Sequence, residues 1–334
     1  MSMRRGAVAI FVTSMALSTV ASAKSYATRP NVTWLASSVP DSARIELSKI
    51  FETDSNAPMK LTAQGSCAVK GKFLTTTKVG TCKIELRLSA TSEFAAFTSS
   101  AVVQVKKKTE MTVLAAASLA TSFEAIGKTF IAKFLNVSLK FNFAGSATLA
   151  TQIQQGAPVD IVALADIANM ERVLVSGDID RKSVTTLVRN RLAILVQRGN
   201  PRKINSLNDL ARAGLRVVLC DLAQPCGKYA ATVLANANVG LTVASREASA
   251  SGVVLRVGLG EADAGIAYIS DGIVAGDKVD AVKIAENLNM IAEYPIGVAI
   301  EPTTKDKTAI MAFLTMTKSA VGHKVFAENG FILP

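Results

Sequence analysis

From Met111 to its end, the chain alternates short apolar runs with amphipathic stretches, and this alternation restricts the possible folds more than any other feature. The run 112–116 is followed by Leu119, Phe123, Ile126, Phe130 and Phe134, which are spaced by three or four residues. Apolar residues at this spacing lie on one face of a helix. Similar pairs of apolar run and helical pattern recur further along the chain. The alternation predicts an α/β fold built of parallel sheets with helices on both faces.

The region before Met111 has a different texture. Residues 31–105 contain short runs in which every second residue is apolar, such as 83–88 and 101–105, separated by Ser, Thr and Gly. Alternation with a period of two, together with frequent turn residues, is typical of a small antiparallel β domain. The polar segment 106–110 is predicted to be the linker between the two parts.

Length and composition narrow the class of protein. A chain of 334 residues is longer than one core usually supports, and 49% apolar with 19% charged residues excludes a disordered protein. Aromatic residues make up only 5%, and no helix gathers the basic residues behind the net charge of +11. We therefore expect no nucleic acid as a partner.

The first 23 residues are typical of a secretory signal peptide. Arg4 and Arg5 precede an apolar stretch at 7–20, and Ala21-Ser22-Ala23 forms a small-residue cleavage site. A membrane anchor is the alternative, but the stretch is short and Ser and Thr interrupt it. No later segment reaches the roughly 20 apolar residues of a spanning helix. The mature protein, beginning at residue 24, is predicted to be periplasmic or secreted.

Four cysteines in an exported chain favour disulfide bonds. Cys67 and Cys82 lie in the front region, whereas Cys220 and Cys226 lie together in the back region. Three connectivities are possible, and pairing within each region is the most economical. The short 220–226 loop also requires favourable geometry.

The chain has a single histidine, His323. This excludes metal sites built on several histidines and makes a histidine-based catalytic triad improbable. An enzyme that uses Ser118, Ser146 or Cys226 as nucleophile is an alternative, but a general base is hard to supply. We expect no enzyme, no cofactor and no bound metal cation.

Three strand-to-helix junctions carry small or hydroxyl residues. Ser118, the segment 145–148 and the segment 225–229 each follow a predicted strand and begin a predicted helix. A helix start presents free backbone N–H groups and the positive end of the helix dipole, so it attracts anions without Lys or Arg. Either serine alone could be an ordinary N-cap. Three such junctions in one module favour a shared anionic ligand.

These segments resemble motifs of the periplasmic molybdate-binding proteins of ABC transporters. The resemblance covers about residues 111–334 in order and leaves the front region outside. It rests on the segments 112–119, 143–150, 155–160, 190–192, 225–230, 260–268 and 328–331. In the front region, 65–69 and 80–84 resemble the paired Gly-x-Cys strands of bacterial Ig-like repeats, which implies a sandwich bridged between two strands.

The resemblance implies a two-lobed periplasmic-binding-protein fold, type II-like, at 111–334. Lobe 1 would contain about 111–191 and 295–334, and lobe 2 about 192–294, closing together on one tetrahedral oxyanion. An N-terminal all-β Ig-like sandwich domain at 24–105 would precede it. We expect a monomer.

Carried over position by position, the resemblance implies five ligand-binding residues. They are the hydroxyls of Ser118 and Ser146, the backbone N–H groups of Cys226 and Ala250, and the phenol of Tyr268. The chain departs from the family at 249–251, where members usually have an acidic or amide residue, then Val, then a basic residue. A backbone donor tolerates such changes, although its position could differ by one.

The types of residue at these positions suit an anion that carries no proton. Molybdate offers four accepting oxygens, whereas monohydrogen phosphate needs an acceptor, and none of the five residues is a carboxylate. Tungstate is nearly the same size as molybdate, and sulfate is smaller. We expect a solute-binding protein that delivers molybdate or tungstate to a permease. Binding of another tetrahedral oxyanion such as sulfate, or surface interaction through the front domain, are the alternatives.

Overall fold

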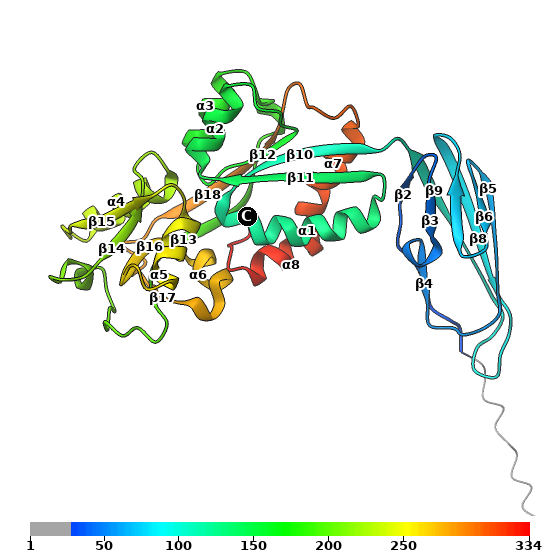
Figure 1. Ribbon diagram of the computed structural model, residues 1–334, viewed down its shortest axis with the longest axis horizontal. Helices are drawn as coiled ribbons and strands as arrows, with labels where there is room; N and C mark the ends of the chain where they lie inside the picture. The colour runs from blue at the N-terminus through cyan, green and yellow to red at the C-terminus, as the bar shows by residue number, and fades with distance from the viewer. Residues whose placement is uncertain (1–27) are drawn as a thin grey trace, which may run out of the picture.

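The computed structural model describes residues 28–334, so the predicted signal peptide at 1–23 lies outside the described residues. The chain forms an all-β front part and an α/β back part (Figure 1). Strand β9 (Phe97–Lys106) belongs to the front part and strand β10 (Thr109–Ala116) to the back part. Only Lys107 and Lys108 lie between these two strands.

The front part consists of small sheets around a core of its own. A four-stranded sheet has the order β2-β9-β8-β5, a three-stranded sheet the order β3-β7-β6, and β1 pairs with β4. The remaining strands are β1 (Val32–Trp34), β2 (Ser38–Pro40), β3 (Arg44–Glu46), β4 (Phe51–Thr53), β5 (Met59–Gly65), β6 (Cys67–Lys70), β7 (Phe73–Thr76) and β8 (Gly80–Leu88).

Alternating burial explains why these segments form strands. In β8, every second side chain from Cys82 to Leu88 is buried, and the residues between them face outward. Such alternation places one face of a strand against a core. The Cys67–Cys82 disulfide joins β6 of the smaller sheet to β8 of the larger one, as the sequence predicts. The all-β character of this part therefore agrees with the sequence-based expectation.

The back part is organised by one nine-stranded sheet with the order β11-β10-β12-β18-β13-β16-β14-β15, in which β17 also pairs with β13. The long strand β13 pairs with β18 through its first half and with β16 and β17 through its second half. Two lobes therefore share this strand. The strands are β11 (Val137–Ala144), β12 (Ile161–Ala163), β13 (Thr185–Gln197), β14 (Val217–Cys220), β15 (Val243–Glu247), β16 (Ala264–Tyr268), β17 (Val279–Lys283) and β18 (Ile291–Val298).

The expectation of parallel sheets is only half right. Strand β10 is parallel to β11 and β12, and β14 is parallel to β15 and β16. Strands β13 and β18 run antiparallel to their neighbours. The sequence of an apolar run does not show whether the strand will be parallel or antiparallel to its neighbours. The strands β13 and β18, which cross between the lobes, pair antiparallel with the strands beside them. The result is a mixed sheet in which antiparallel strands join the parallel strands of the two lobes.

Helices cover both faces of the lobe 1 sheet. Helix α1 lies with α7 and α8 on one side of β10 and β11, and α2 and α3 lie on the other (Figure 1). Phe123, Ile126 and Phe130, predicted to share one helical face, are fully buried. Within 28–334, no helix combines the length and apolar character needed to cross a membrane. The helices are α1 (Ala120–Lys133), α2 (Ser146–Gln154), α3 (Ile167–Val175), α4 (Pro225–Asn236), α5 (Ala250–Gly258), α6 (Ile269–Ala275), α7 (Lys307–Thr317) and α8 (Ala320–Glu328).

The front part is attached to lobe 1 by more than the chain connection. The backbone N–H of Ser37 donates to the carbonyl of Lys133 at 2.7 Å, and that of Leu135 donates to the carbonyl of Ser38 at 2.9 Å. The Leu135 side chain packs against the core of the front part. The Ser38 hydroxyl also donates to the buried side chain of Asn136. The segment between α1 and β11 therefore fixes the front part to lobe 1.

Candidate anion-binding site

The five predicted ligand-binding residues line one cavity between the two lobes. Each lies at or beside the start of a helix. Ser118 is in the 3-10 turn before α1, Ser146 begins α2, Cys226 is the second residue of α4, Ala250 begins α5, and Tyr268 is the N-cap of α6. The cavity is lined by Ala116, Ala117, Ser118, Ala144, Gly145, Ser146, Ala165, Gln224, Pro225, Cys226, Ser249, Ala250 and Tyr268.

The size and lining of the cavity suit one compact ligand. Its volume is about 20 Å³, where a single bound water needs roughly 10–15 Å³ on the same scale. A second hollow, lined by Arg191 and Ile332 among others, has about 580 Å³. The cavity lining contains neither acidic nor basic side chains. An anion would therefore be bound by hydroxyl and backbone N–H donors and by helix dipoles alone.

On the lobe 1 side, Ser146 is already committed as an acceptor. Its Oγ accepts a hydrogen bond from the backbone N–H of Ala165 at 2.9 Å, and its side chain is almost completely buried. Since a serine hydroxyl carries one proton, that proton remains available for a ligand. Gly145 is the N-cap of α2, and Gly145 and Ser146 line the cavity, so the N–H of Ser146 at the first helical position has no partner within the helix.

Ser118 is oriented by a chain of buried polar groups from the strands that link the lobes. Its Oγ lies 3.0 Å from the Tyr294 hydroxyl, which lies 3.4 Å from the Asn190 amide nitrogen. The Asn190 amide oxygen accepts from the Arg191 N–H at 2.9 Å, which orients the amide so that its nitrogen donates to Tyr294. Tyr294 is then free to donate to Ser118. Either hydroxyl can donate in this contact, and in the order with Tyr294 as donor the Ser118 proton is left for the cavity.

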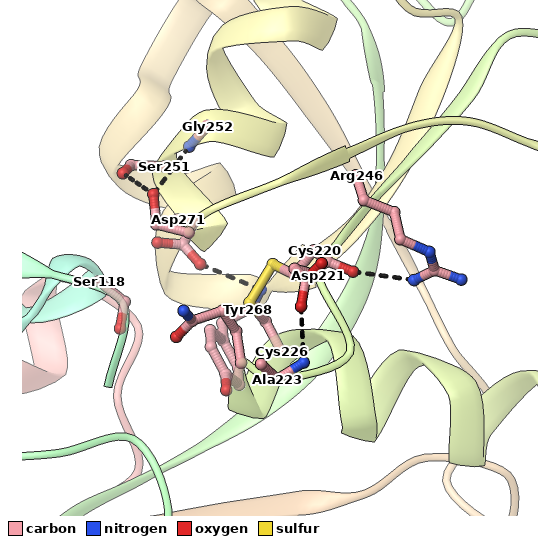
Figure 2. The surroundings of a disulfide bond; sticks show 12 residues. Ser118, Cys220, Asp221, Ala223, Cys226, Arg246, Ser251, Gly252, Tyr268 and Asp271 are labelled. Carbon is pink, nitrogen blue, oxygen red and sulfur yellow. Dashed lines mark hydrogen bonds between the residues drawn. A yellow bond between two sulfur atoms is a disulfide. The ribbon is translucent and has the colours of Figure 1, made fainter. Parts of the chain in front are cut away.

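On the lobe 2 side, Cys226 is held by a disulfide bond. Cys220 ends β14, and the Cys220–Cys226 bond closes the turn that leads into α4. Pro225 occupies the first position of the helix, where its missing N–H costs nothing. Figure 2 shows the disulfide beside Tyr268, with Ser118 approaching from the other lobe. The pairing agrees with the sequence prediction, and Cys226 offers its backbone N–H rather than a thiol.

Ala250 lines the cavity at the start of a helix. It is the first residue of α5, and the Ser249 side chain caps the helix by accepting from the Gly252 N–H at 3.3 Å. Because the capping hydroxyl takes the N–H of the third helical residue, the Ala250 N–H at the first position is left to face the cavity. The unusual 249–251 segment therefore still builds a helix start at this place.

Tyr268 presents a buried hydroxyl without a partner. Within 28–334, its Oη forms no hydrogen bond although the side chain is only 1% exposed. Burial raises the pKa of Tyr268 well above its usual value, so the phenol stays protonated and can donate. Its backbone N–H donates to the Asp271 carboxylate at 3.0 Å. Burial also raises the pKa of Asp271, to about 7, against the opposing effect of that hydrogen bond.

Comparison with known proteins decides the family. Residues 111–332 match the family model described as bacterial extracellular solute-binding protein. The chain belongs to this family. Among the relatives of this solute-binding protein is the molybdate-binding protein ModA of Mycobacterium tuberculosis H37Rv. The two are 36% identical over 222 residues, which cover 66% of this chain and 84% of ModA.

Solved structures agree on the fold of the family. The periplasmic molybdate-binding protein of Azotobacter vinelandii is 18% identical with a TM-score of 0.59, and the match covers 67% of this chain and 99% of that one. The sulfate-binding protein SubI of M. tuberculosis H37Rv is 21% identical with the same TM-score of 0.59, covering 67% and 86%. Both support the fold alone. Since their names state different anions, the fold does not select the anion.

Sequence reasoning missed three residues at the site. Tyr294 and Asn190 orient Ser118, and Gln224 lines the cavity between the lobes. Their partners across the site lie 76 to 176 positions away in sequence, so no local pattern indicates these contacts. Among the described residues, no group of three or more His, Cys, Asp or Glu side chains is placed to hold a metal ion.

Proposed function

We propose that this solute-binding protein captures molybdate or tungstate in the cavity and delivers it to the permease of an ABC transporter. Ser118, Ser146, Cys226, Ala250 and Tyr268 are its proposed ligand-binding residues. The proposal draws support from the relatives named as molybdate-binding proteins and from the neutral donors that line the cavity.

One observation carries the choice of a proton-free anion. Ser146 already has a hydrogen-bond donor on the protein side, the Ala165 N–H, and the Tyr294 hydroxyl lies 3.0 Å from the Ser118 hydroxyl, to which we infer that it donates. Each serine therefore turns its own proton toward the ligand. Monohydrogen phosphate would bring a further proton that finds no committed acceptor in this lining, and an unpaired buried donor costs about 1–3 kcal/mol. Molybdate, tungstate and sulfate have no such proton.

Sulfate is the remaining competitor, and its smaller size argues against it. Donors held at helix starts and by a disulfide cannot move far to follow a smaller ion. A sulfate ion would leave some of these donors with long, weak hydrogen bonds. Selection between molybdate and sulfate would then depend on size, and molybdate and tungstate should bind alike.

A melting experiment with four anions tests the proposal. Molybdate, tungstate, sulfate and phosphate are each added in excess, and the melting temperature is compared with that of the free protein. A ligand at 100 times its Kd stabilises the folded state by about 2.7 kcal/mol, so molybdate and tungstate should raise the melting temperature clearly. A larger shift with sulfate than with molybdate would overturn the assigned specificity.

The other parts of the chain are assigned roles that fit this function. We propose that residues 1–23 are a signal peptide and that the mature chain acts as a monomer in the periplasm or after secretion. We further propose an Ig-like domain at 24–105, a linker at 106–110, and a binding module at 111–334. Its lobes would comprise about 111–191 with 295–334, and 192–294. The module would act without cofactor or catalysis.

A further inference from the structure

Gln224 reaches from lobe 2 into lobe 1. It is the N-cap residue of α4, and its side-chain oxygen accepts from the backbone N–H of Ala147 in α2 at 3.1 Å. Its side-chain nitrogen donates to the Thr148 hydroxyl at 3.1 Å. The residue is only 6% exposed. Both polar atoms of one amide are thus satisfied by the opposite lobe.

The lobes approach most closely at the same place. A Cβ atom on Gly145 would lie 2.3 Å from the Gln224 side-chain oxygen and 2.5 Å from the carbonyl oxygen of Ala248. The φ angle of Gly145 is −62°, which any residue can adopt. A glycine is therefore required here for space. Two loops of lobe 2 close over the start of α2 only because position 145 carries no side chain.

The turn that presents Gln224 is rigid. The Cys220–Cys226 disulfide closes it, and within it the Gln224 N–H donates to the Asp221 carbonyl at 3.0 Å. The Ala223 N–H donates to the Asp221 carboxylate at 2.8 Å (Figure 2). An amide on such a turn loses little further freedom when it bonds to lobe 1, so its hydrogen bonds contribute more to closure.

We propose that Gln224 is an interlobe latch, which holds the clamp closed and slows release of the anion. The inference rests on the proposed function, because it takes the anion as the retained ligand, whereas the interlobe contact itself is expected in the free protein as well. Separation of the lobes breaks both hydrogen bonds of the amide. An amide is the suitable group here, since a carboxylate at 224 would add a negative charge beside the anion and could not donate to Thr148.

The test compares Gln224→Ala with Gln155→Ala, an exposed glutamine at the end of α2 that serves as the control. Stopped-flow measurement of molybdate release should show release roughly 5- to 30-fold faster from Gln224→Ala, as expected for two lost hydrogen bonds. The association rate should change little. The control should release molybdate as the wild type does, and an unchanged release rate in Gln224→Ala would overturn the latch.

A second measurement needs no ligand. Hydrogen exchange of the Ala147 amide in the free protein should be faster in Gln224→Ala, because this amide loses its acceptor. Equal exchange rates in both proteins would overturn the latch whatever the ligand. If wild-type protein binds no molybdate but Ala147 loses protection in the variant, the proposed function fails while the interlobe contact stands.

Discussion

The two walls of the cavity use different kinds of donors. In the proposed site, lobe 1 contributes the side-chain hydroxyls of Ser118 and Ser146, which contact the Tyr294 hydroxyl and the Ala165 N–H behind them. Lobe 2 places the backbone N–H groups of Cys226 and Ala250 at helix starts, fixed by a disulfide and a serine cap. Lobe 1 of the proposed site thus acts through the side chains of both serines, whereas in lobe 2 the Tyr268 phenol is a side-chain donor and Cys226 and Ala250 act through their backbone. Lobe 2 can therefore accept an unusual segment such as 249–251.

The comparison assumes that both lobes contact the ligand at the same time. Gly145→Ala should keep the lobes apart and so prevent this. The added Cβ would collide with Gln224 and Ala248 across the cleft. Overpacking of this kind costs about 1–3 kcal/mol, so molybdate affinity should fall by roughly one to two orders of magnitude. Calorimetry measures the loss. Gly240→Ala, where the added Cβ meets open space, is the control and should bind normally.

A direct test of the two walls pairs Ser146→Ala with Ala250→Gly. Loss of the Ser146 hydroxyl removes a charge-assisted hydrogen bond worth about 1.5–3 kcal/mol, so molybdate affinity should fall roughly ten- to a hundredfold. Ala250→Gly keeps its backbone N–H and should change affinity much less. Equal losses in calorimetry would contradict the assignment of a side-chain donor to Ser146 and of a backbone donor to Ala250.

The pH dependence of binding tests the role of Asp271, whose carboxyl group lies next to Tyr268 in lobe 2. The raised pKa of Asp271, about 7, means that its carboxyl group is largely neutral below that pH and ionised above it. A negative charge next to Tyr268 opposes an anion, so molybdate affinity should fall several-fold as pH rises through about 7. Asp271→Asn should flatten this profile in calorimetry between pH 6 and 8. An unchanged slope in the variant would remove Asp271 as its origin.

The same group predicts how the stability of the free protein varies with pH. The pKa of Asp271 is higher in the folded state than its ordinary value of 3.8. The folded protein therefore binds more protons between these two values, and the free energy of unfolding decreases as pH rises from about 4 to about 7. Denaturant titrations over this range should show the decrease, and Asp271→Asn should reduce it.

The smallest effect on binding is expected when the disulfides are removed. Removal of each bond should lower the stability of the protein, but only one of the two should change its affinity for molybdate. The Cys67–Cys82 bond spans 15 residues and should contribute about 3 kcal/mol to the free energy of unfolding, against about 2 kcal/mol for Cys220–Cys226, which spans six. Replacing the first pair by Ala should leave molybdate affinity unchanged. Replacing the second should weaken it a few-fold, because Cys226 keeps its N–H on a looser turn. The reverse pattern would place the front part at the site.

Local signals made much of this architecture predictable. A serine or small residue between an apolar run and a helical pattern indicates a helix start, so Ser118, Ser146 and the segment 225–229 could be singled out before their meeting point was known. The period-two alternation of β8 likewise indicated its strand. The convergence of these helix starts came from the family resemblance, because spacing alone does not say which strands are neighbours.

The unpredicted features all depend on contacts across the lobes or across the linking strands. The role of Gln224 depends on its contact with α2 of the other lobe. The role of Tyr294 depends on β18, which places its hydroxyl next to Ser118. Gly145 carries no turn signal, since its backbone angles are ordinary. The antiparallel direction of β13 and β18 was not predicted either, because an apolar run does not show in which direction its strand will pair.

The contacts of the front part described above are with lobe 1, through the nearly continuous strands β9 and β10 and through Leu135. This asymmetry has a mechanical consequence. If the front part were tethered to another surface, the pull would pass into lobe 1 and bypass the strands β13 and β18 that connect the lobes. Lobe 2 would then be the mobile lobe, which opens and closes while lobe 1, with Ser118 and Ser146, stays fixed.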